Sequence, residues 1–400
     1  MDTCIFKKDS PFIVALLASA EVAHSERLDA QTDRAAALLA DADQLSQLCV
    51  ACFWASLEVE EGREVRGTVT ICSPDSVRMA RVFTHPVPVS VPNLVALLTA
   101  SPRTPLAVHG GPEGLSIWGM LDAEPEGLLR LRLSGNGILL ASRERRVLAL
   151  LNQGVVSIPV AADETSLAQL VARTLGKERF LEQHGNAPAR FIRVVATMLR
   201  HGHGGALVLV PPEDSSWRAG VSFRFCFDEE SGRLLQHSVH DFETGMDETL
   251  RGYEDLVSGR ASCTSLTGLR EQYDAVNYLR TLSESLFRRV GDLGLIDGAV
   301  VMDMDLMLHG FGAKLLFGPE EFAVTTLNAV TGRVREHVPL SELGGMRHQS
   351  AARFVQANRE TDVFVVSQDG RLSMMSWSER TQTVAVVQNM EHFIWEYRTF

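Results

Sequence analysis

The stretch GGMRHQSAARFVQANRETDVFVVSQDGRL, residues 344–372, does most to decide the fold of the C-terminal half. After the glycine pair Gly344-Gly345, apolar residues recur at helical spacing, so we predict a helix there. An apolar run at 363–366 then predicts a buried strand. Asp369-Gly370, placed before the next apolar segment, predicts a hairpin turn. The stretch therefore predicts a helix packed on a sheet, with its polar residues at the ends of elements.

The sequence upstream extends this α/β pattern back to Ala187. A helical pattern from Phe191 to Leu199 leads through a glycine turn into the apolar run Ala206 to Val210, which predicts a buried strand. Another amphipathic helix spans Val276 to Val290 and precedes a strand at Ala299 to Met302. Between the first strand and this helix, residues 213–269 are polar and weakly periodic. We predict an insertion or elaborated loop for that segment.

The N-terminal half has a different pattern, with a helix from Leu45 to Leu57 followed by short strand-like runs. Gly, Pro or Glu residues separate these runs, and this pattern predicts an α+β domain rich in short strands. We expect a closing helix at about 166–175 and a boundary at Gly185-Asn186-Ala187-Pro188. The fold class is thus α/β (α+β): an N-terminal mixed α+β domain, then a mixed-sheet α/β domain with helices around the sheet.

Composition and charge restrict the partners of the chain. Its 400 residues exceed the roughly 150 that one domain usually takes. The formal net charge of -12 repels a phosphate backbone, so we expect no DNA or RNA partner. The six cysteines lie in predicted core segments, which favours a reducing compartment and a cytoplasmic location.

Two N-terminal features have alternative interpretations. The C-x-x-C pair of Cys49 and Cys52 lies in an apolar helical segment without a second ligand pair, so buried thiols are favoured over a zinc site. The apolar run from Pro11 to Ala20 resembles a short secretory signal but is flanked by Asp9 and Glu21. It is too short to span a membrane. We favour an N-terminal helix and expect no membrane span, with a signal peptide as the alternative.

The segment Gly344 to His348 is the most informative candidate site. Backbone N–H groups at a glycine-rich helix start form a natural anion site, and Arg347 and His348 add charge and donors. The guanidinium group of an arginine can bind a phosphate through two parallel hydrogen bonds. The alternative is that Arg347 forms a surface salt bridge and His348 packs in a loop.

Other candidate residues have weaker signals. Asp297-Gly298-Ala299 is a tripeptide that is common in turns. Because it precedes a predicted strand, Asp297 could instead hold Mg²⁺ or Mn²⁺ against triphosphate oxygens. His201 and His203 suggest a metal, although a flexible glycine turn explains them better. Gly310-Phe311-Gly312-Ala313 indicates either a turn where a ligand or a backbone comes near, or a bulge.

These motifs, in this order, resemble the diadenylate cyclase (DAC) domain. The resemblance rests on Asp297-Gly298-Ala299, on Gly345-Met346-Arg347-His348-Gln349-Ser350-Ala351-Ala352, on Thr361-Asp362 leading into Val365-Val366-Ser367, and on Gly205-Ala206-Leu207. Further patches resemble proteins that couple such a domain to an N-terminal DACNV-type sensor domain. These patches are Ser56-Leu57-Glu58, Glu60-Glu61-Gly62-Arg63, His203-Gly204-Gly205 and Gly310-Phe311-Gly312-Ala313. The resemblance implies a helical extension at 1–44, a DACNV-like domain at 45–184 and a DAC-like domain at 187–400.

The resemblance also implies a function and a site. The family condenses two ATP molecules into cyclic di-AMP, with release of pyrophosphate, between two domains that meet face to face as a homodimer. Asp297, Arg347 and His348 would be catalytic, with Asp297 and His348 at the Mg²⁺ or Mn²⁺. The nucleotide-binding residues implied are Gly298, Ala299, Gly345, Met346, Gln349 and Ser367. The N-terminal sensor domain would regulate the cyclase.

This chain departs from the family at several site positions. Met346 and Gln349 replace a Thr and an Arg that flank Arg-His in the family, and Gln368-Asp369 replaces an acidic pair. These changes remove a hydroxyl, a positive charge and a carboxylate. Two hypotheses therefore stand: a divergent cyclase, or a catalytically weak or inactive domain that binds a nucleotide or cyclic dinucleotide as a sensor. A structural part of a larger complex is a third possibility.

Overall fold

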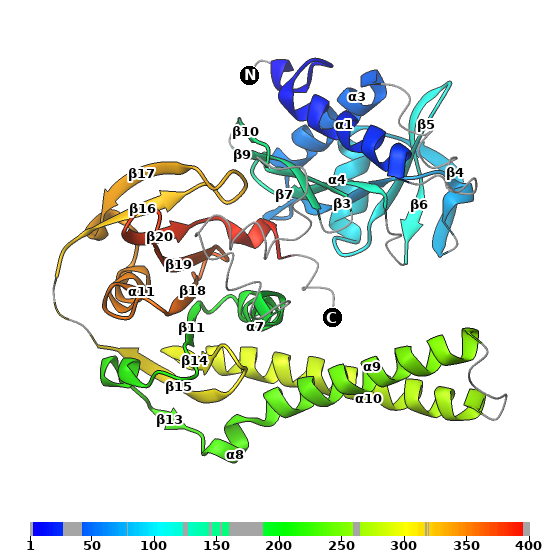
Figure 1. Cartoon of the computed structure of the whole chain (residues 1–400). Coiled ribbons are helices and arrows are strands. Elements are labelled where there is room, and N and C mark those ends of the chain that lie inside the picture. The colour runs from blue at the N-terminus through cyan, green and yellow to red at the C-terminus, as the bar shows by residue number, and fades with distance from the viewer. Residues whose placement is uncertain are drawn as a thin grey trace. The chain divides into compact units, whose positions relative to one another are not determined.

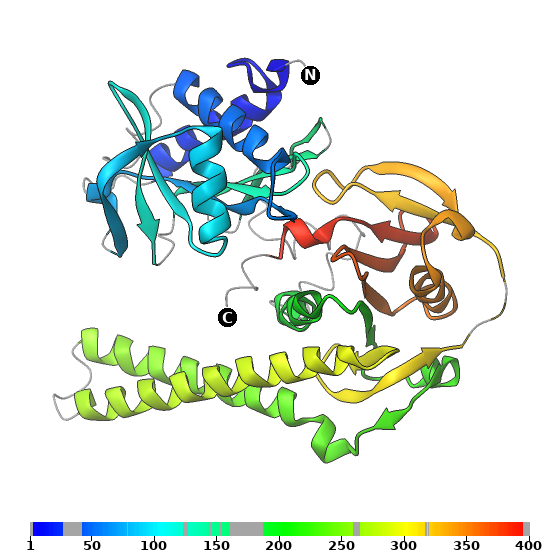
Figure 2. The ribbon, with the colours of Figure 1, turned by 180° about the vertical axis from the view of Figure 1, so that it is seen from behind.

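The chain folds into two compact units, Met1–Leu170 and Val171–Phe400. The computed structural model describes residues 3–26, 42–77, 79–122, 127–143, 146–152, 154–159, 187–258, 265–316, 318 and 320–394. Each unit combines one large mixed sheet with helices (Figures 1 and 2), which confirms the predicted α+β class. The helix predicted at 166–175 and the boundary residues Gly185-Asn186 lie outside the described residues.

The first unit is built on an eight-stranded sheet in the order β10-β9-β8-β7-β3-β5-β6-β4. Among these described strands, only β3 and β5 pair in parallel. The strands are β3 (Arg66–Ile71), β4 (Ala80–Pro88), β5 (Leu106–Gly111), β6 (Gly114–Leu121), β7 (Leu129–Ser134), β8 (Leu139–Arg143), β9 (Arg146–Asn152) and β10 (Val155–Ser157). A separate pair, β1 (Val59–Glu60) and β2 (Arg63–Glu64), follows the helix that ends at Leu57.

Helices cover one face of this sheet and share a core with it. They are α1 (Pro11–Glu26), α3 (Ala42–Leu57) and α4 (Val91–Ala100). Phe12 of α1, Leu48 of α3 and Leu98 of α4 are buried in the same cluster as Val69 and Leu131 of the sheet. The predicted N-terminal helix is confirmed, and its first turns belong to the core of this unit.

The second unit contains a mixed sheet in the order β12-β15-β14-β11-β18-β19-β20-β16-β17, with β13 also paired to β15. Its central strands are β11 (Gly205–Val210), β14 (Ala299–Asp303), β15 (Leu308–Leu315), β18 (Asp362–Val366), β19 (Leu372–Ser378) and β20 (Thr383–Val387). The outer strands are β12 (Val221–Ser222), β13 (Phe225–Cys226), β16 (Ala323–Leu327) and β17 (Val334–Pro339). The pairs β11–β14 and β16–β20 are parallel.

Helices lie on both faces of the second sheet. Helix α11 (Met346–Ala357) and helix α7 (Ala187–His201) lie on opposite sides of β11 and β18 (Figure 1). Strand alternation explains this layering, because Val208 and Val363 pack with Phe354 of α11. Their neighbours Leu207 and Phe364 are buried on the other face. The helix predicted after Gly344-Gly345, the strand predicted at 363–366 and the hairpin turn are confirmed.

Of the two alternatives for residues 213–269, an insertion or an elaborated loop, the loop is wrong. This segment contains β12, β13, the short helix α8 (Glu229–Gly232) and the long helix α9 (Leu234–Val257). Helix α9 pairs with α10 (Ser265–Asp292), as Figure 2 shows. The two helices approach closely through glycines, since a Cβ on Gly245 would lie 3.1 Å from Val276 Cγ2. Apolar residues nevertheless recur at helical spacing along α9, at Leu235, Val239, Phe242, Met246, Tyr253 and Val257.

Two further expectations can be compared with the described residues. Cys49, Cys52 and Cys72 are buried free thiols, as predicted for the C-x-x-C pair, whereas Cys226 is exposed on β13 and does not lie in a core. Burial raises the pKa of the Cys52 thiol to about 12. Across the part of the chain that is described, no helix has the length and apolar character needed to cross a membrane.

Candidate functional site

A close contact between two strands fixes the Asp297-Gly298-Ala299 motif at the start of β14. Gly298 has φ +121°, and a Cβ on it would lie 2.6 Å from Gly312 C and 2.9 Å from Ala313 N of β15. Only glycine fits this backbone and this gap. Both interpretations of Gly310 to Ala313 therefore hold, because a second backbone comes near and β14 and β15 also change register along their pairing. Asp297 is consequently held at the strand entrance.

Arg347, at the start of α11, lies against Asp297. Its Nη2 donates to Asp297 Oδ1 over 3.1 Å. The Arg347 side chain is 38% exposed and that of Asp297 is 91% exposed, so solvent reaches the pair. The first N–H groups of α11, from Met346 and Arg347, open toward the N-terminal end of the helix. A carboxylate, a guanidinium and the positive end of a helix dipole therefore meet at one place.

Gly204 makes room for Arg347 beside the sheet. It has φ +70°, and a Cβ there would lie 2.7 Å from Arg347 Nη1 and 3.0 Å from Val366 O. The glycine turn before β11 thus supports the guanidinium position. His201 Nε2 donates to Asp292 Oδ1 over 2.8 Å, which ties α7 to α10. The glycine turn therefore packs against Arg347 and Val366.

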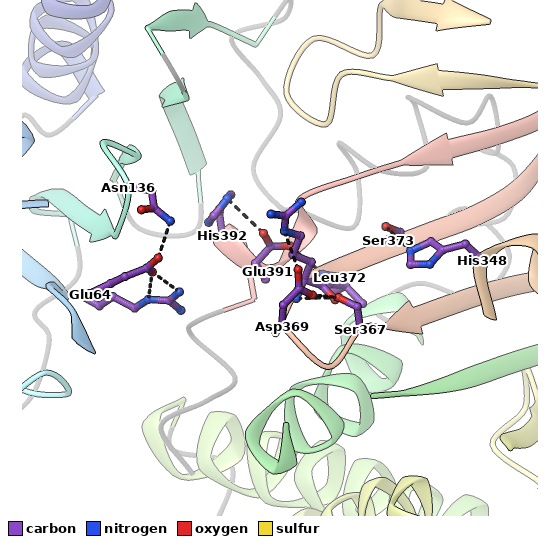
Figure 3. A network of polar contacts seen from close by, with 11 residues as sticks. Glu64, Asn136, His348, Ser367, Asp369, Leu372, Ser373, Glu391 and His392 are labelled. Atoms are coloured by element: carbon purple, nitrogen blue, oxygen red, sulfur yellow. Dashed lines mark hydrogen bonds and ion pairs between the residues drawn. The ribbon is translucent and has the colours of Figure 1, made fainter. Parts of the chain in front are cut away.

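His348 faces the sheet beneath the helix start. Its Nε2 lies 3.3 Å from Ser373 Oγ. Figure 3 shows the two side chains next to each other. Gly344 lies beside its ring, since a Cβ there would be 3.6 Å from His348 Cγ. Burial lowers the pKa of His348, and the negative charge of Asp369 partly opposes this effect. His348 is therefore a neutral imidazole at physiological pH.

Ser367 and Asp369 lie in the hairpin turn between β18 and β19 (Figure 3). Ser367 Oγ donates to Asp369 Oδ1, and Arg371 Nε lies 3.1 Å from Asp369 Oδ2. The hydroxyl hydrogen bond, aided by the charge of Arg371, holds the pKa of Asp369 below its ordinary value. Asp369 is thus a fixed negative charge near His348.

The remaining predicted nucleotide-binding residues differ in what they present. Gln349 Nε2 donates to Gly344 O over 3.0 Å, so this amide braces the loop. The Met346 side chain is 73% exposed, while Ala299 is buried and offers only its backbone. Gly345 is the N-cap of α11 and has no side chain to block an approaching anion.

The side chains available for a metal ion are few. Within the described ranges, no group of three His, Cys, Asp or Glu side chains is arranged to hold a metal. Asp297 keeps its Oδ2 available, whereas His348 Nε2 already lies near Ser373. Mg²⁺ is typically held by one or two carboxylates together with substrate phosphates. Asp297 fits that arrangement, and the nucleotide would have to supply most of the other ligands.

Arg224 is a neighbour of the site that sequence analysis missed. A Cβ on Gly312 would lie 3.1 Å from Arg224 Cβ, and Gly312 packs on Gly298. The Arg224 guanidinium carbon lies 5.2 Å from the Phe225 ring centroid, and Phe225 stacks on Phe311 at 4.8 Å. A cation backed by aromatic rings thus lies next to the Asp-Gly-Ala motif. Its position inside the expected insertion concealed it.

One family comparison bears on the N-terminal unit. Residues 34–122 match the family model described as probable sensor domain DACNV. This match supports a sensory region in the first unit and indicates sensor-regulated signalling. Neither a curated protein nor a solved structure matches the chain.

Proposed function

We propose that the second unit is a metal-dependent nucleotide cyclase that condenses two ATP molecules into cyclic di-AMP or a related cyclic dinucleotide, regulated by the sensory region. The observation that carries this proposal is the 3.1 Å contact between Asp297 and Arg347, which lie 50 residues apart in two motifs that resemble the cyclase family. The pair lies at a helix N-terminus, where a triphosphate is favoured.

The reaction divides between two copies of the site. Each ATP 3′-hydroxyl attacks the α-phosphorus of the other ATP, a P–O bond forms, and pyrophosphate leaves with the electron pair of the broken bond. Asp297 accepts the hydroxyl proton, while Arg347 and the N–H groups of α11 stabilise the charge on the phosphates. Bound Mg²⁺ or Mn²⁺ would withdraw further charge from the triphosphate. A homodimer through these faces is required.

The ion pair between Asp297 and Arg347 must open when a nucleotide binds. Because both side chains are solvent-exposed, the pair stabilises the free protein by only about 0–1 kcal/mol. One charge-assisted hydrogen bond from arginine to a phosphate contributes about 1.5–3 kcal/mol. Exchange of the carboxylate for a phosphate is therefore favourable, and it frees Asp297 for the hydroxyl and the metal.

The test is incubation of the purified chain with ATP or GTP and Mn²⁺, followed by detection of cyclic dinucleotide. We expect Asp297→Asn to abolish product. Asp305→Asn, an exposed carboxylate at the other end of the β14–β15 hairpin, is the matched control and should leave turnover unchanged. Equal activity of the Asp297 variant and the parent would refute the assignment.

A second candidate function is nucleotide binding without turnover. Gln349 favours it, because its amide is used by Gly344 O where the family has a cationic side chain. Such a sensor would bind ATP or a cyclic dinucleotide in calorimetry with equal affinity in the parent and in Asp297→Asn, and would form no product. Cyclic dinucleotide formed by the parent and lost in Asp297→Asn would instead favour the cyclase.

A further inference from the structure

A buried pair of ionisable side chains lies beside the hairpin that joins β18 to β19. Glu391 and His392 belong to the 3₁₀ helix Met390–His392, which follows β20. Their side chains are only 10% and 7% exposed, and His392 Nε2 lies 3.3 Å from Glu391 Oε1. Figure 3 shows the pair next to the hairpin. A glutamate is seldom buried unless its carboxylate has partners, and neither residue has a part in the reaction proposed above.

The carboxylate of Glu391 accepts a hydrogen bond from the backbone of the hairpin. Leu372 N donates to Glu391 Oε2 over 2.9 Å. Ser367 N donates to Arg371 O over 2.9 Å, and backbone bonds alternate along antiparallel strands, so the N–H of Leu372 points away from β18. On that side, the described pairing between β19 and β20 does not extend to Leu372. Glu391 thus supplies the acceptor that β20 does not.

Leu372 is flanked in the chain by two residues that contact side chains of the candidate site. On one side, Arg371 Nε lies 3.1 Å from Asp369 Oδ2. On the other side, Ser373 Oγ lies 3.3 Å from His348 Nε2. Consecutive Cα atoms are about 3.8 Å apart and joined by a planar peptide, so neither neighbour can stay in place when Leu372 moves. The position of this one backbone residue therefore sets both contacts.

The N–H of Leu372 needs an acceptor because the residue is buried. Leu372 is 0% exposed, and a buried N–H without a partner is costly enough for the backbone to move toward water or another acceptor. Glu391 prevents that movement, while His392 contacts the other carboxylate oxygen, Oε1. The 3₁₀ helix after β20 and the hairpin are thus joined through one carboxylate.

We propose that Glu391 is a positioning residue for the candidate site and that it acts through the N–H of Leu372. It holds the start of β19 so that the contacts of Asp369 and His348 keep their geometry. Both oxygens of its carboxylate are turned toward protein groups, so its effect on the nucleotide is indirect. The inference rests on the proposed function, since it gives the hairpin a part in turnover.

Turnover of ATP by variants at Glu391 tests the proposal. Glu391→Gln keeps the length of the side chain and an oxygen that accepts from Leu372, so it should keep the kcat of the parent. Glu391→Asp keeps the charge but is one methylene shorter, and its kcat should fall about tenfold, the effect of losing one hydrogen bond to a charged group. Glu391→Ala should lose roughly a hundredfold, as expected for a misplacement of about 1 Å. The KM should change little, because Arg347 is held by Asp297.

Glu379→Ala is the matched control, since Glu379 is an exposed carboxylate that directly follows the other end of β19. It should leave kcat and KM unchanged. A kcat of Glu391→Asp equal to or above that of Glu391→Gln would overturn the proposal, because charge and not the hydrogen bond to Leu372 would then matter. A raised KM with unchanged kcat in Glu391→Ala would overturn it as well.

Amide hydrogen exchange of the full chain separates this inference from the cyclase proposal, because it needs no turnover. In peptides that contain Leu372, its amide should exchange about tenfold faster in Glu391→Ala than in the parent, and at the parent rate in Glu391→Gln and Glu379→Ala. Glu391→Asp replaces Glu391→Ala if the alanine variant does not fold. Equal protection of Leu372 in the parent and in the Ala or Asp variant would overturn the inference. A parent that forms no product would refute the cyclase, and the exchange result would then decide this inference alone.

Discussion

Gly298→Ala tests the geometry that holds the Asp-Gly-Ala motif. The new Cβ would meet the backbone atoms Gly312 C at 2.6 Å and Ala313 N at 2.9 Å, at φ +121°. Such backbone strain costs about 1–3 kcal/mol. Overpacking against atoms that cannot rotate away costs about 1–3 kcal/mol more. We therefore expect the second unit to lose about 4 kcal/mol, which for a unit of this size lowers its midpoint by roughly 10 °C.

Gly370→Ala is the matched control for this prediction. Gly370 has φ +80°, and a Cβ added there would meet no atom within 4 Å, so only the left-handed backbone penalty applies. That penalty is about 1–2 kcal/mol, or roughly 4 °C. Scanning calorimetry of the full chain measures both variants. Equal losses for Gly298→Ala and Gly370→Ala would show that the contact with β15 does not constrain the motif.

Three further predictions concern single side chains. Arg224→Ala should weaken ATP binding in calorimetry by about tenfold, which is the effect of losing one charge-assisted hydrogen bond. The control Arg335→Ala, on β17, should not change the affinity. Equal affinities of the parent and Arg224→Ala would show that Arg224 is not part of the site. The pKa of His348 is lowered in the folded protein, so the unfolded chain takes up the proton first as the pH falls. The free energy of unfolding should therefore decrease as the pH drops through about 6.5, and His348→Asn should flatten this profile in denaturant titrations. A rise in stability on acidification would contradict the prediction. A thiol reagent at neutral pH should modify Cys226 before Cys49 and Cys52 in peptide mapping, because burial raises the pKa of the Cys49 and Cys52 thiols. The reverse order of modification would show that α3 opens.

Local periodicity predicted the elements around α11 because their signals lie within a short stretch. Phe354 and Val355 mark the buried face of the helix, and Asp369-Gly370 marks the turn. Helix α9 escaped prediction for a physical reason. Its contact face contains Gly245 and Gly252, where a Cβ would meet Val276 and Leu269. Glycine normally weakens a helix, so these two positions obscure the apolar stripe that runs from Leu235 to Val257.

The candidate site was predictable only in part. The resemblance named Asp297 and Arg347, but their contact depends on the order of β14, β11 and β18 in the sheet. Gly204 and Arg224 approach the site from distant segments. The patch His203-Gly204-Gly205 marks Gly204 only as part of a glycine turn, and no local pattern marks Arg224.

The most direct test of the central claim is quantification of the products that the purified chain forms from ATP with Mn²⁺. Condensation of two ATP molecules requires two pyrophosphates for each cyclic dinucleotide. We predict that ratio for the parent chain, and neither product for Asp297→Asn or Arg347→Lys. Absence of cyclic dinucleotide with both ATP and GTP, under conditions where a known cyclase works, would contradict the account.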